Sequence, residues 1–133
     1  MKAIPKSHQG LLKDETKAFV YLATVMKDGA PQVTPTWFDM DGEYIRINTV
    51  RGRIKDKNMR ARPAVALCIA DPHDPYRYLQ VRGKVVEMIT EGAEDHIDTL
   101  NLKYHGNPNY PNHSPDKPRV IYKIEPVKVD AYG

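Results

Sequence analysis

Six cationic side chains surround a single glycine in the segment from residue 48 to residue 63. The glycine is Gly52, and the cations are Arg51, Arg53, Lys55, Lys57, Arg60 and Arg62. Backbone N–H groups are left unpaired where a strand turns into a helix, and fixed cations beside them favour an anion over water. The pattern predicts a phosphate-binding site, and its structural alternative is a solvated basic helix.

The basic segment itself allows two local structures. Alternate residues from 51 to 57 are cationic, which would put them on one face of a strand. From Ile54 onward, however, most residues are good helix formers, and Pro63 would stop a helix at the preceding residue. A short helix after Gly52 is therefore predicted, with Lys55 in its first turn and one side formed by Arg53, Lys57 and Arg60.

Alternating apolar residues and turn-forming pairs predict strands on both sides of this segment. Strands are expected over residues 18–26, 31–39, 43–48, 64–70, 76–89 and 119–129. The run 64–70 is apolar throughout, which indicates burial on both faces, and Gly83 is expected to mark a bend or bulge. A helix is expected from Thr90 to Gly106, followed by a proline-rich loop or lid.

These elements predict a mainly β protein, an antiparallel barrel of about six strands with flanking helices. A chain of 133 residues is expected to form one domain over residues 1–133. Because so small a barrel is filled by its own side chains, a ligand would lie outside it, in a groove or between subunits.

Composition narrows the partners and the compartment. The net charge of +3 is concentrated in one segment, which favours a local anionic ligand over nucleic acid. The single Cys68 excludes an internal disulfide and fits a reducing cytoplasm. A cytoplasmic protein without a membrane partner is expected, because neither a signal-peptide core nor a membrane-length apolar run is found. The five histidines lack metal-ligand spacing, so no metal is expected.

The chain resembles the split β-barrel flavin and deazaflavin oxidoreductases, the superfamily of the pyridoxamine 5′-phosphate oxidases. The resemblance rests on the Asp-Gly hairpin, the Asn-Thr strand end, Arg-Gly-Arg-x-Lys, and Pro-Tyr-Arg-Tyr-Leu-Gln-Val-Arg-Gly. Within that superfamily it is more similar to the small reductases that use coenzyme F420, through residues 51–53, Lys55, Asn58, residues 103–106 and Tyr110. The resemblance implies a homodimer with two cofactor sites at the interface.

The resemblance also implies a set of cofactor-binding residues. Arg53 and Lys55 would bind the phosphate, and Thr49 would offer a hydroxyl at the strand end. Residues 32–37 would lie beneath the ring, and the tyrosines near residue 77 would come from the second subunit. The full set is Gln32, Thr34, Pro35, Thr36, Trp37, Asn48, Thr49, Arg51, Arg53, Ile54, Lys55, Lys57, Asn58, Tyr76 and Tyr78.

The implied function is that of a coenzyme F420-dependent oxidoreductase, which transfers hydride between the deazaflavin and a small unsaturated or electron-poor organic acceptor. The F420 tail carries carboxylates beyond its phosphate, so the further cations Arg51, Lys57 and Arg60 favour F420. One alternative is an FMN-dependent reductase or oxidase at the same site, and another is a non-catalytic flavin or haem carrier. No catalytic residue is identified, although His105 is a candidate proton donor.

Overall fold

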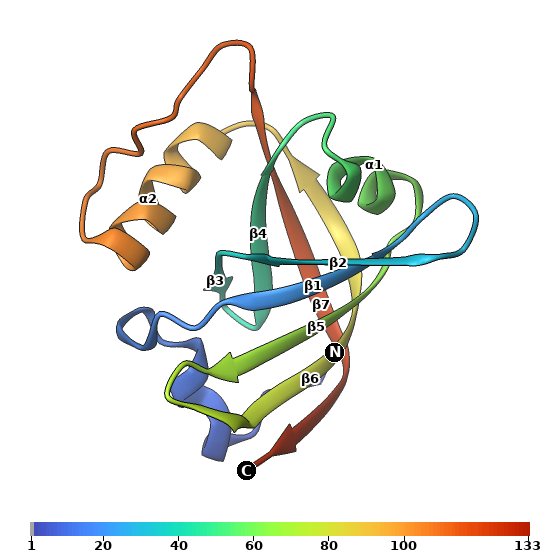
Figure 1. The fold of residues 1–133 in the computed structure, drawn as a ribbon, viewed down its shortest axis with the longest axis vertical. Helices are drawn as coiled ribbons and strands as arrows, with labels where there is room; N and C mark the ends of the chain where they lie inside the picture. Colours follow the sequence, from blue (N-terminus) through green and yellow to red (C-terminus); the bar gives the residue numbers. More distant parts are fainter. Residues whose placement is uncertain (1) are drawn as a thin grey trace.

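Seven strands form one antiparallel sheet in the computed structural model, which describes residues 2–133 (Figure 1). They are β1 (Val20–Val25), β2 (Pro31–Thr36), β3 (Phe38–Asp41), β4 (Tyr44–Val50), β5 (Ala64–Asp71), β6 (Asp74–Ile89) and β7 (Arg119–Tyr132). Their order across the sheet is β2-β1-β5-β6-β7-β4-β3. The predicted mainly β split-barrel fold is confirmed, with seven strands instead of six. Met1, the first residue of the predicted domain, lies outside the described residues.

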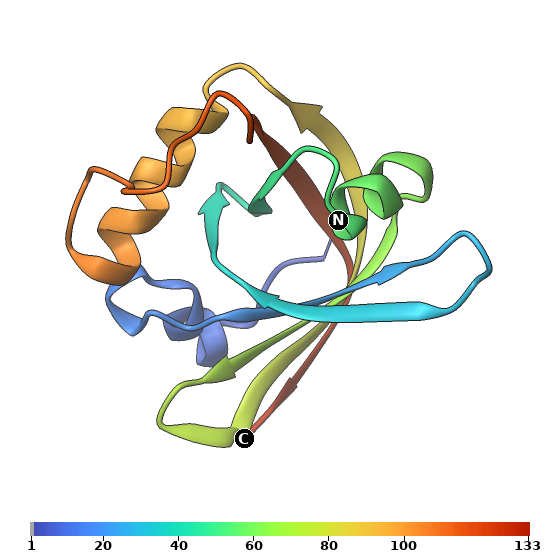
Figure 2. The same ribbon diagram turned by 45° about the horizontal axis from the view of Figure 1, so that its top comes forward.

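The additional strand arises because the expected strand 31–39 is divided at Trp37. Residues 31–36 pair with β1, whereas residues 38–41 pair with β4. The edge strands β2 and β3 are therefore consecutive in the chain, with one residue between them. Figure 2 shows the sheet curling so that these two edges come to the same side of an open barrel.

Side chains on the inner face of the curled sheet form the core. Alternate positions of β1, β5 and the middle of β6 are buried, as the period of a strand requires, whereas residues 47–50 of β4 and 119–122 of β7 are buried on both faces. Strand β5 is not buried on both faces as predicted, because only Val65, Leu67 and Ile69 point inward, and the alternate Ala64 and Ala66 are exposed. An apolar run of small residues thus gave a misleading signal of two-sided burial.

Strands β6 and β7 are the longest of the sheet, with 16 and 14 residues. Their register shifts between Arg82 and Gly83, so the bulge predicted at Gly83 is confirmed. A Cβ atom at Gly83 would lie 2.7 Å from the Cγ2 atom of Ile124. The glycine therefore permits the close approach of the two strands at the bulge.

Two α-helices flank the mouth of the barrel (Figure 1). Helix α1 (Ile54–Ala61) follows the basic turn, as predicted, and α2 (Ala93–His105) ends at Gly106, which has a φ of 73°. Two short 3-10 helices near the N-terminus, η1 (Lys6–Leu12) and η2 (Asp14–Thr16), were not predicted, because such short helices lack a clear hydrophobic period. Within residues 2–133, no helix has the length and apolar character needed to span a membrane.

Candidate functional site

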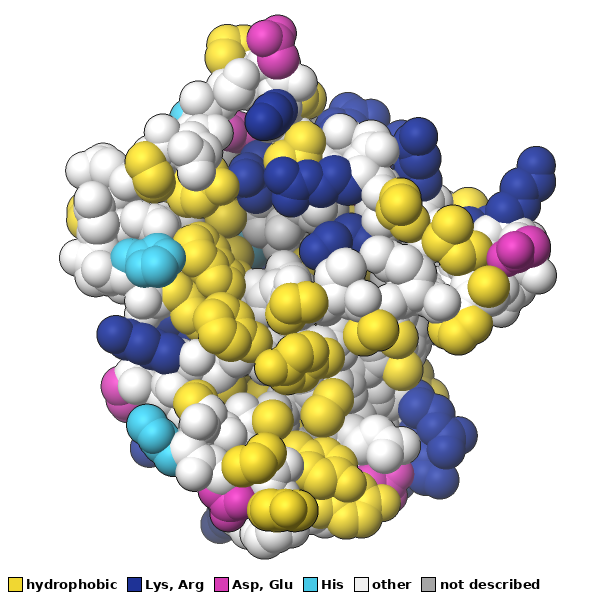
Figure 3. All heavy atoms as spheres, viewed as in Figure 1, with side chains coloured by type: hydrophobic (Ala, Val, Ile, Leu, Met, Phe, Trp, Pro, Cys, Tyr) yellow, Lys and Arg dark blue, Asp and Glu magenta, His cyan; other side chains and the backbone are white. Residues whose placement is uncertain are grey.

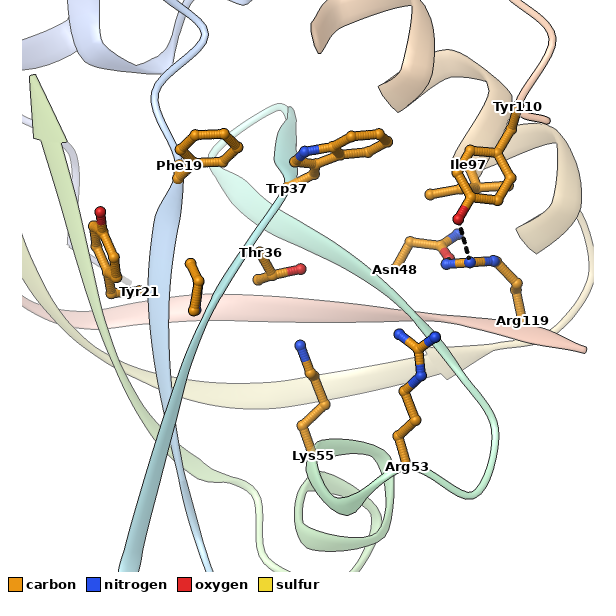
Figure 4. A pocket seen from close by; sticks show the side chains of 11 residues that line it. Phe19, Tyr21, Thr36, Trp37, Asn48, Arg53, Lys55, Ile97, Tyr110 and Arg119 are labelled. Carbon is orange, nitrogen blue, oxygen red and sulfur yellow. Dashed lines mark hydrogen bonds between the residues drawn. The ribbon is translucent and has the colours of Figure 1, made fainter. Parts of the chain in front are cut away.

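A cavity of about 470 Å³ lies at the mouth of the barrel, between α1 and α2. Its lining comes from β1, the end of β2, β4, α1 and the turn before it, α2, the loop after α2 and β7 (Figure 4). The lining residues are Phe19, Tyr21, Pro35, Thr36, Trp37, Asn48, Arg53, Lys55, Ile97, Tyr110 and Arg119. Figure 3 shows Lys and Arg side chains around a hollow in this region, with a band of hydrophobic side chains beside it.

One end of the cavity is cationic. The side chains of Arg53 and Lys55 extend from the N-terminal end of α1 into the space, and Arg119 lies across from Arg53 (Figure 4). Burial, with a contribution from Arg53, lowers the pKa of Lys55. The cavity lining contains three cations and no carboxylate. An anion would therefore gain fixed positive charges and relieve their mutual repulsion.

Arg119 is the most buried of these cations, with 9% of its surface exposed. Its guanidinium donates to Asn48 Oδ1 at 3.2 Å and to the Tyr110 hydroxyl at 3.0 Å, so both acceptors are neutral. The guanidinium also lies 4.8 Å from the centre of the Tyr110 ring. Burial lowers the pKa of Arg119 below its ordinary value. A buried guanidinium with neutral partners is an unsatisfied charge that an anionic ligand would stabilise.

The turn before α1 is held by a buried carboxylate. Gly52, with a φ of 93°, donates its N–H to Asp56 Oδ2 at 2.7 Å, and Tyr122 donates its hydroxyl to Oδ1 at 2.5 Å. Asp56 is fully buried and also accepts hydrogen bonds from Arg60. These contacts fix the backbone that presents Arg53 and Lys55 to the cavity.

The other end of the cavity is aromatic. Trp37 stacks on Tyr104 with ring centres 5.0 Å apart, and Tyr104 stacks on Phe19 at 5.4 Å. The Tyr104 hydroxyl donates to the Ala18 carbonyl at 2.6 Å and accepts the Phe38 N–H at 3.3 Å. Tyr104 is therefore fixed between β1 and β3, and it supports a flat apolar wall suited to a planar ring.

Six of the fifteen predicted site residues line the cavity: Pro35, Thr36, Trp37, Asn48, Arg53 and Lys55. Lys57 and Arg60, which were expected on the same helix side as Arg53, do not line it, and Arg60 is paired with Asp56 at 2.7 Å. Arg51 and Ile54 are exposed and do not line the cavity.

The remaining predicted residues lie elsewhere in this chain. Asn58 is buried and donates to the Thr24 hydroxyl, and Gln32 accepts from that same hydroxyl. Thr34 and Thr49 each have a buried hydroxyl oxygen without a hydrogen-bond partner among the described residues. Near the start of β6, Tyr76 is 83% exposed and Tyr78 stacks on Tyr132.

Five lining residues were absent from the predicted cofactor set: Phe19, Tyr21, Ile97, Tyr110 and Arg119. Tyr110 belongs to the loop predicted as a lid, and its ring lies edge-on to Trp37 at 6.3 Å. His105, the candidate proton donor, lies edge-on to Trp37, with the ring centres 5.3 Å apart, and is not part of the lining. Nothing in the local sequence around Arg119 indicates that it reaches the cavity, because its place depends on the pairing of β7 with β4.

A curled antiparallel sheet with a cationic and aromatic cavity at its mouth is a split β-barrel. The family model described as pyridoxamine 5′-phosphate oxidase matches residues 4–133. The chain therefore belongs to the pyridoxamine 5′-phosphate oxidase family. The comparison with curated proteins found no match.

Several solved structures are similar to this chain over most of its length. A protein described as an F420 reductase is 36% identical, with a TM-score of 0.84 over 96% of this chain and 98% of its own. The conserved hypothetical protein Rv2991 from Mycobacterium tuberculosis is 18% identical, with a TM-score of 0.75 over 99% and 89%. An FMN-binding, pyridoxamine 5′-phosphate oxidase-related protein from Nostoc punctiforme is 18% identical, with a TM-score of 0.69 over 98% and 86%. The last two similarities show the fold alone.

Proposed function

We propose that this protein is a coenzyme F420-dependent oxidoreductase that transfers hydride between the deazaflavin and a small unsaturated or electron-poor organic acceptor. The observation that carries the proposal is the cavity itself, which joins three cations at one end to an aromatic wall at the other. Its donor set fits a ligand that has both a planar ring and an anionic tail. The similarity to a protein described as an F420 reductase supports F420 as that ligand.

The residues present suggest how the two ends of such a cofactor are held. Arg53 offers a planar fork of donors to a phosphate, and Lys55 adds a point charge. Trp37 and Phe19 provide apolar surface for the ring and exclude water from it. When bound, the deazaflavin itself supplies the hydride, so the protein contributes position and electrostatics.

The number of cations near the cavity favours F420 over FMN. Arg53, Lys55 and Arg119 line it, and Arg51 and Lys57 are exposed in the same basic segment. A single phosphate would not use all of these charges, whereas the acidic tail of F420 adds carboxylates that could. Arg60 is not available to such a tail, because its guanidinium is paired with Asp56. FMN remains the alternative ligand, since it presents a phosphate to the same cations.

Exposed apolar surface supports a homodimer with the sites at the interface. Phe19 and Tyr21 are 46% and 45% exposed, although both line the cavity, and Tyr76 is 83% exposed. A second subunit that covers them would also enclose the cavity. Light scattering after size exclusion should give twice the mass of one chain, and a monomer at micromolar concentration would contradict the dimer.

The central test of the proposed function is a fluorescence titration of the purified protein with F420 and, separately, with FMN. We expect F420 to bind more tightly, and we expect the reduced cofactor to be oxidised when a quinone or nitro compound is added. Binding without oxidation by any acceptor would favour a carrier. A yellow protein that binds FMN more tightly than F420 would favour the FMN-dependent alternative.

The double variant Arg53→Gln/Lys55→Gln tests the cationic end of the cavity. We expect it to bind F420 at least about tenfold more weakly, because it lacks two charge-assisted contacts. Stability should change little, since Arg53 is exposed and the half-buried Lys55 lies near a second cation rather than an acid. The matched control Lys6→Gln/Lys128→Gln removes the same charge from exposed positions outside the cavity. Equal affinities for the two double variants would overturn the assignment.

A further inference from the structure

A chain of buried polar side chains lies behind the cavity wall. It runs from Asp39 on β3 through His96 on α2 to Asn48 on β4, and it ends at Arg119 on β7. Asp39, His96 and Asn48 are at most 8% exposed. Only Asn48 and Arg119 belong to the cavity lining, so the other two act on the site from outside it.

The hydrogen bonds of Asn48 fix the orientation of its amide. Its Nδ2 atom lies 2.8 Å from the carbonyl oxygen of Ala93, which can only accept a hydrogen bond. Its Oδ1 atom lies 3.2 Å from the guanidinium of Arg119, which can only donate. A reversed amide would place two acceptors together at one end and two donors together at the other.

This orientation determines the protonation of His96. Asn48 Nδ2 also lies 3.2 Å from His96 Nδ1, so Nδ1 must carry a lone pair and no proton. His96 Nε2 lies 3.0 Å from Asp39 Oδ1, and a carboxylate there accepts a hydrogen bond from Nε2. His96 is therefore the neutral imidazole with its proton on Nε2. With this tautomer, every donor in the hydrogen bonds from Asp39 to Arg119 faces an acceptor.

Asp39 is ionised in this arrangement. Burial alone would raise the pKa of Asp39, but hydrogen bonds from His96 and Arg46 outweigh it and hold the pKa below its ordinary value. Arg46 donates to both carboxylate oxygens, at 2.9 Å and 2.7 Å. An ionised Asp39 excludes the tautomer of His96 that carries its proton on Nδ1, because Nε2 would then face it with a lone pair.

We propose that Asp39 and His96 are positioning residues of the cavity, which orient the Asn48 amide so that its oxygen holds the Arg119 guanidinium at the cationic end. This inference rests on the proposed function only in the identity of the ligand, because the orientation exists in the protein alone. Without the acceptor at His96 Nδ1, the Ala93 carbonyl alone would hold the Asn48 amide group, and the Arg119 guanidinium would lose the fixed position of its acceptor.

The variants Asp39→Asn and His96→Leu interrupt the hydrogen bonds that run from Asp39 to Arg119 at two different points. An amide in place of the Asp39 carboxylate would admit the wrong tautomer of His96, and a leucine at residue 96 would remove one of the two acceptors of the Asn48 amide group. We expect both to bind F420 roughly fivefold to tenfold more weakly, the worth of about one hydrogen bond. His96→Gln should recover most of the affinity, because glutamine both donates and accepts. Asp95→Asn, a change of the same kind at an exposed position of α2, is the matched control.

Two measurements separate this inference from the proposed function. Nitrogen NMR of the ligand-free protein should show His96 protonated on Nε2 only, and this signal should change in Asp39→Asn. A titration with inorganic phosphate should show the same order of affinities as F420. If wild-type protein binds neither F420 nor FMN, the proposed function fails. Both measurements still test whether Asp39 and His96 position Asn48 and Arg119. A charged or Nδ1-protonated His96, or folded Asp39→Asn and His96→Leu variants with wild-type phosphate affinity, would overturn it.

Discussion

Gly52 donates its backbone N–H to the carboxylate of Asp56 across 2.7 Å, which ties the basic turn to the first turn of α1. Arg53 lies between the two residues in an extended conformation, and Lys55 directly precedes Asp56. The two cavity-lining cations of this segment, Arg53 and Lys55, thus depend on a buried acid that does not line the cavity. The carboxylate anchors the turn that presents them.

Asp56→Ala should destabilise the protein by roughly 3–5 kcal/mol, because the Gly52 N–H and the Tyr122 hydroxyl lose hydrogen bonds to a carboxylate and Arg60 loses its ion pair. The free energy of unfolding, measured with urea, checks this expectation. Asp95→Ala, an exposed acid on α2, should change it by less than about 0.5 kcal/mol. Equal losses for the two variants would show that Asp56 does not anchor the turn.

The same carboxylate gives a defined pH dependence. Burial opposes ionisation, but the hydrogen bonds from Gly52, Tyr122 and Arg60 hold the pKa of Asp56 below its ordinary value of 3.8. The stabilisation is therefore complete above that value and is lost as the pH falls through the lower folded value. The difference in unfolding free energy between wild type and Asp56→Ala should shrink in acid. A constant difference down to about pH 2 would contradict this.

Trp37 is the only tryptophan of the chain and lines the cavity. A planar ligand bound against its ring should quench its fluorescence, so tryptophan emission should report binding without a label. The decrease should saturate at the same concentration as the F420 signal. Trp37→Phe keeps an aromatic wall and removes the signal. If F420 binds while the emission stays constant, the ring does not lie at the aromatic end.

His113 connects the loop after α2 to that helix. Its Nδ1 atom lies 3.0 Å from Glu94 Oε1, and its Nε2 atom lies 2.7 Å from Asp98 Oδ1. Only the imidazolium can donate to both carboxylates, and these hydrogen bonds, that of Asp98 foremost, raise the pKa of His113 above 6.5. Asp98 also accepts the N–H of Tyr110, which places the cavity-lining part of the loop on the same carboxylate.

The loop should therefore loosen as the pH rises. A raised pKa means that the stabilisation is complete below about 6.5, the ordinary value, and is lost as the pH passes through the folded value. Histidine NMR should show the elevated titration. Amide exchange in residues 107–118, corrected for its intrinsic pH dependence, should accelerate over the same range. His113→Asn should abolish that pH dependence, and a titration of His113 at or below 6.5 would refute the expectation.

Gly83 should not tolerate a side chain. A Cβ atom there would lie 2.7 Å from Ile124 Cγ2 and 3.3 Å from the carbonyl oxygen of Glu125. We expect Gly83→Ala to destabilise the protein by about 1–3 kcal/mol through overpacking. Gly10→Ala is the control, since no atom lies within 4 Å of its Cβ position. Thermal unfolding compares the two variants. Equal midpoints would mean that β6 and β7 accommodate the added methyl group without a loss of stability.

Local patterns predicted most of the fold. Apolar alternation and Asp-Gly turns identify the strands, and Pro63 after a run of helix formers identifies α1. The division of the strand at Trp37 was not predicted, because it depends on which distant strand each half pairs with. The two short 3-10 helices were missed for want of a periodic signal.

For the site, too, the residues that could be predicted depend on local sequence, and those that were missed depend on contacts between distant parts of the chain. Arg53 and Lys55 could be proposed because they flank the turn that presents them. Arg119 could not, because it reaches the cavity only through the register of β7 against β4, in which it pairs with Val50. Phe19 likewise depends on its stacking on Tyr104, which lies far later in the chain.

The edge strands β2 and β3 are joined by Trp37 alone, so the chain passes from one edge of the sheet to the other through a single residue. Trp37 also lines the cavity. A ligand that packs against its ring would therefore contact the one residue that joins the two edges of the sheet, so binding there would restrict how far those edges can separate.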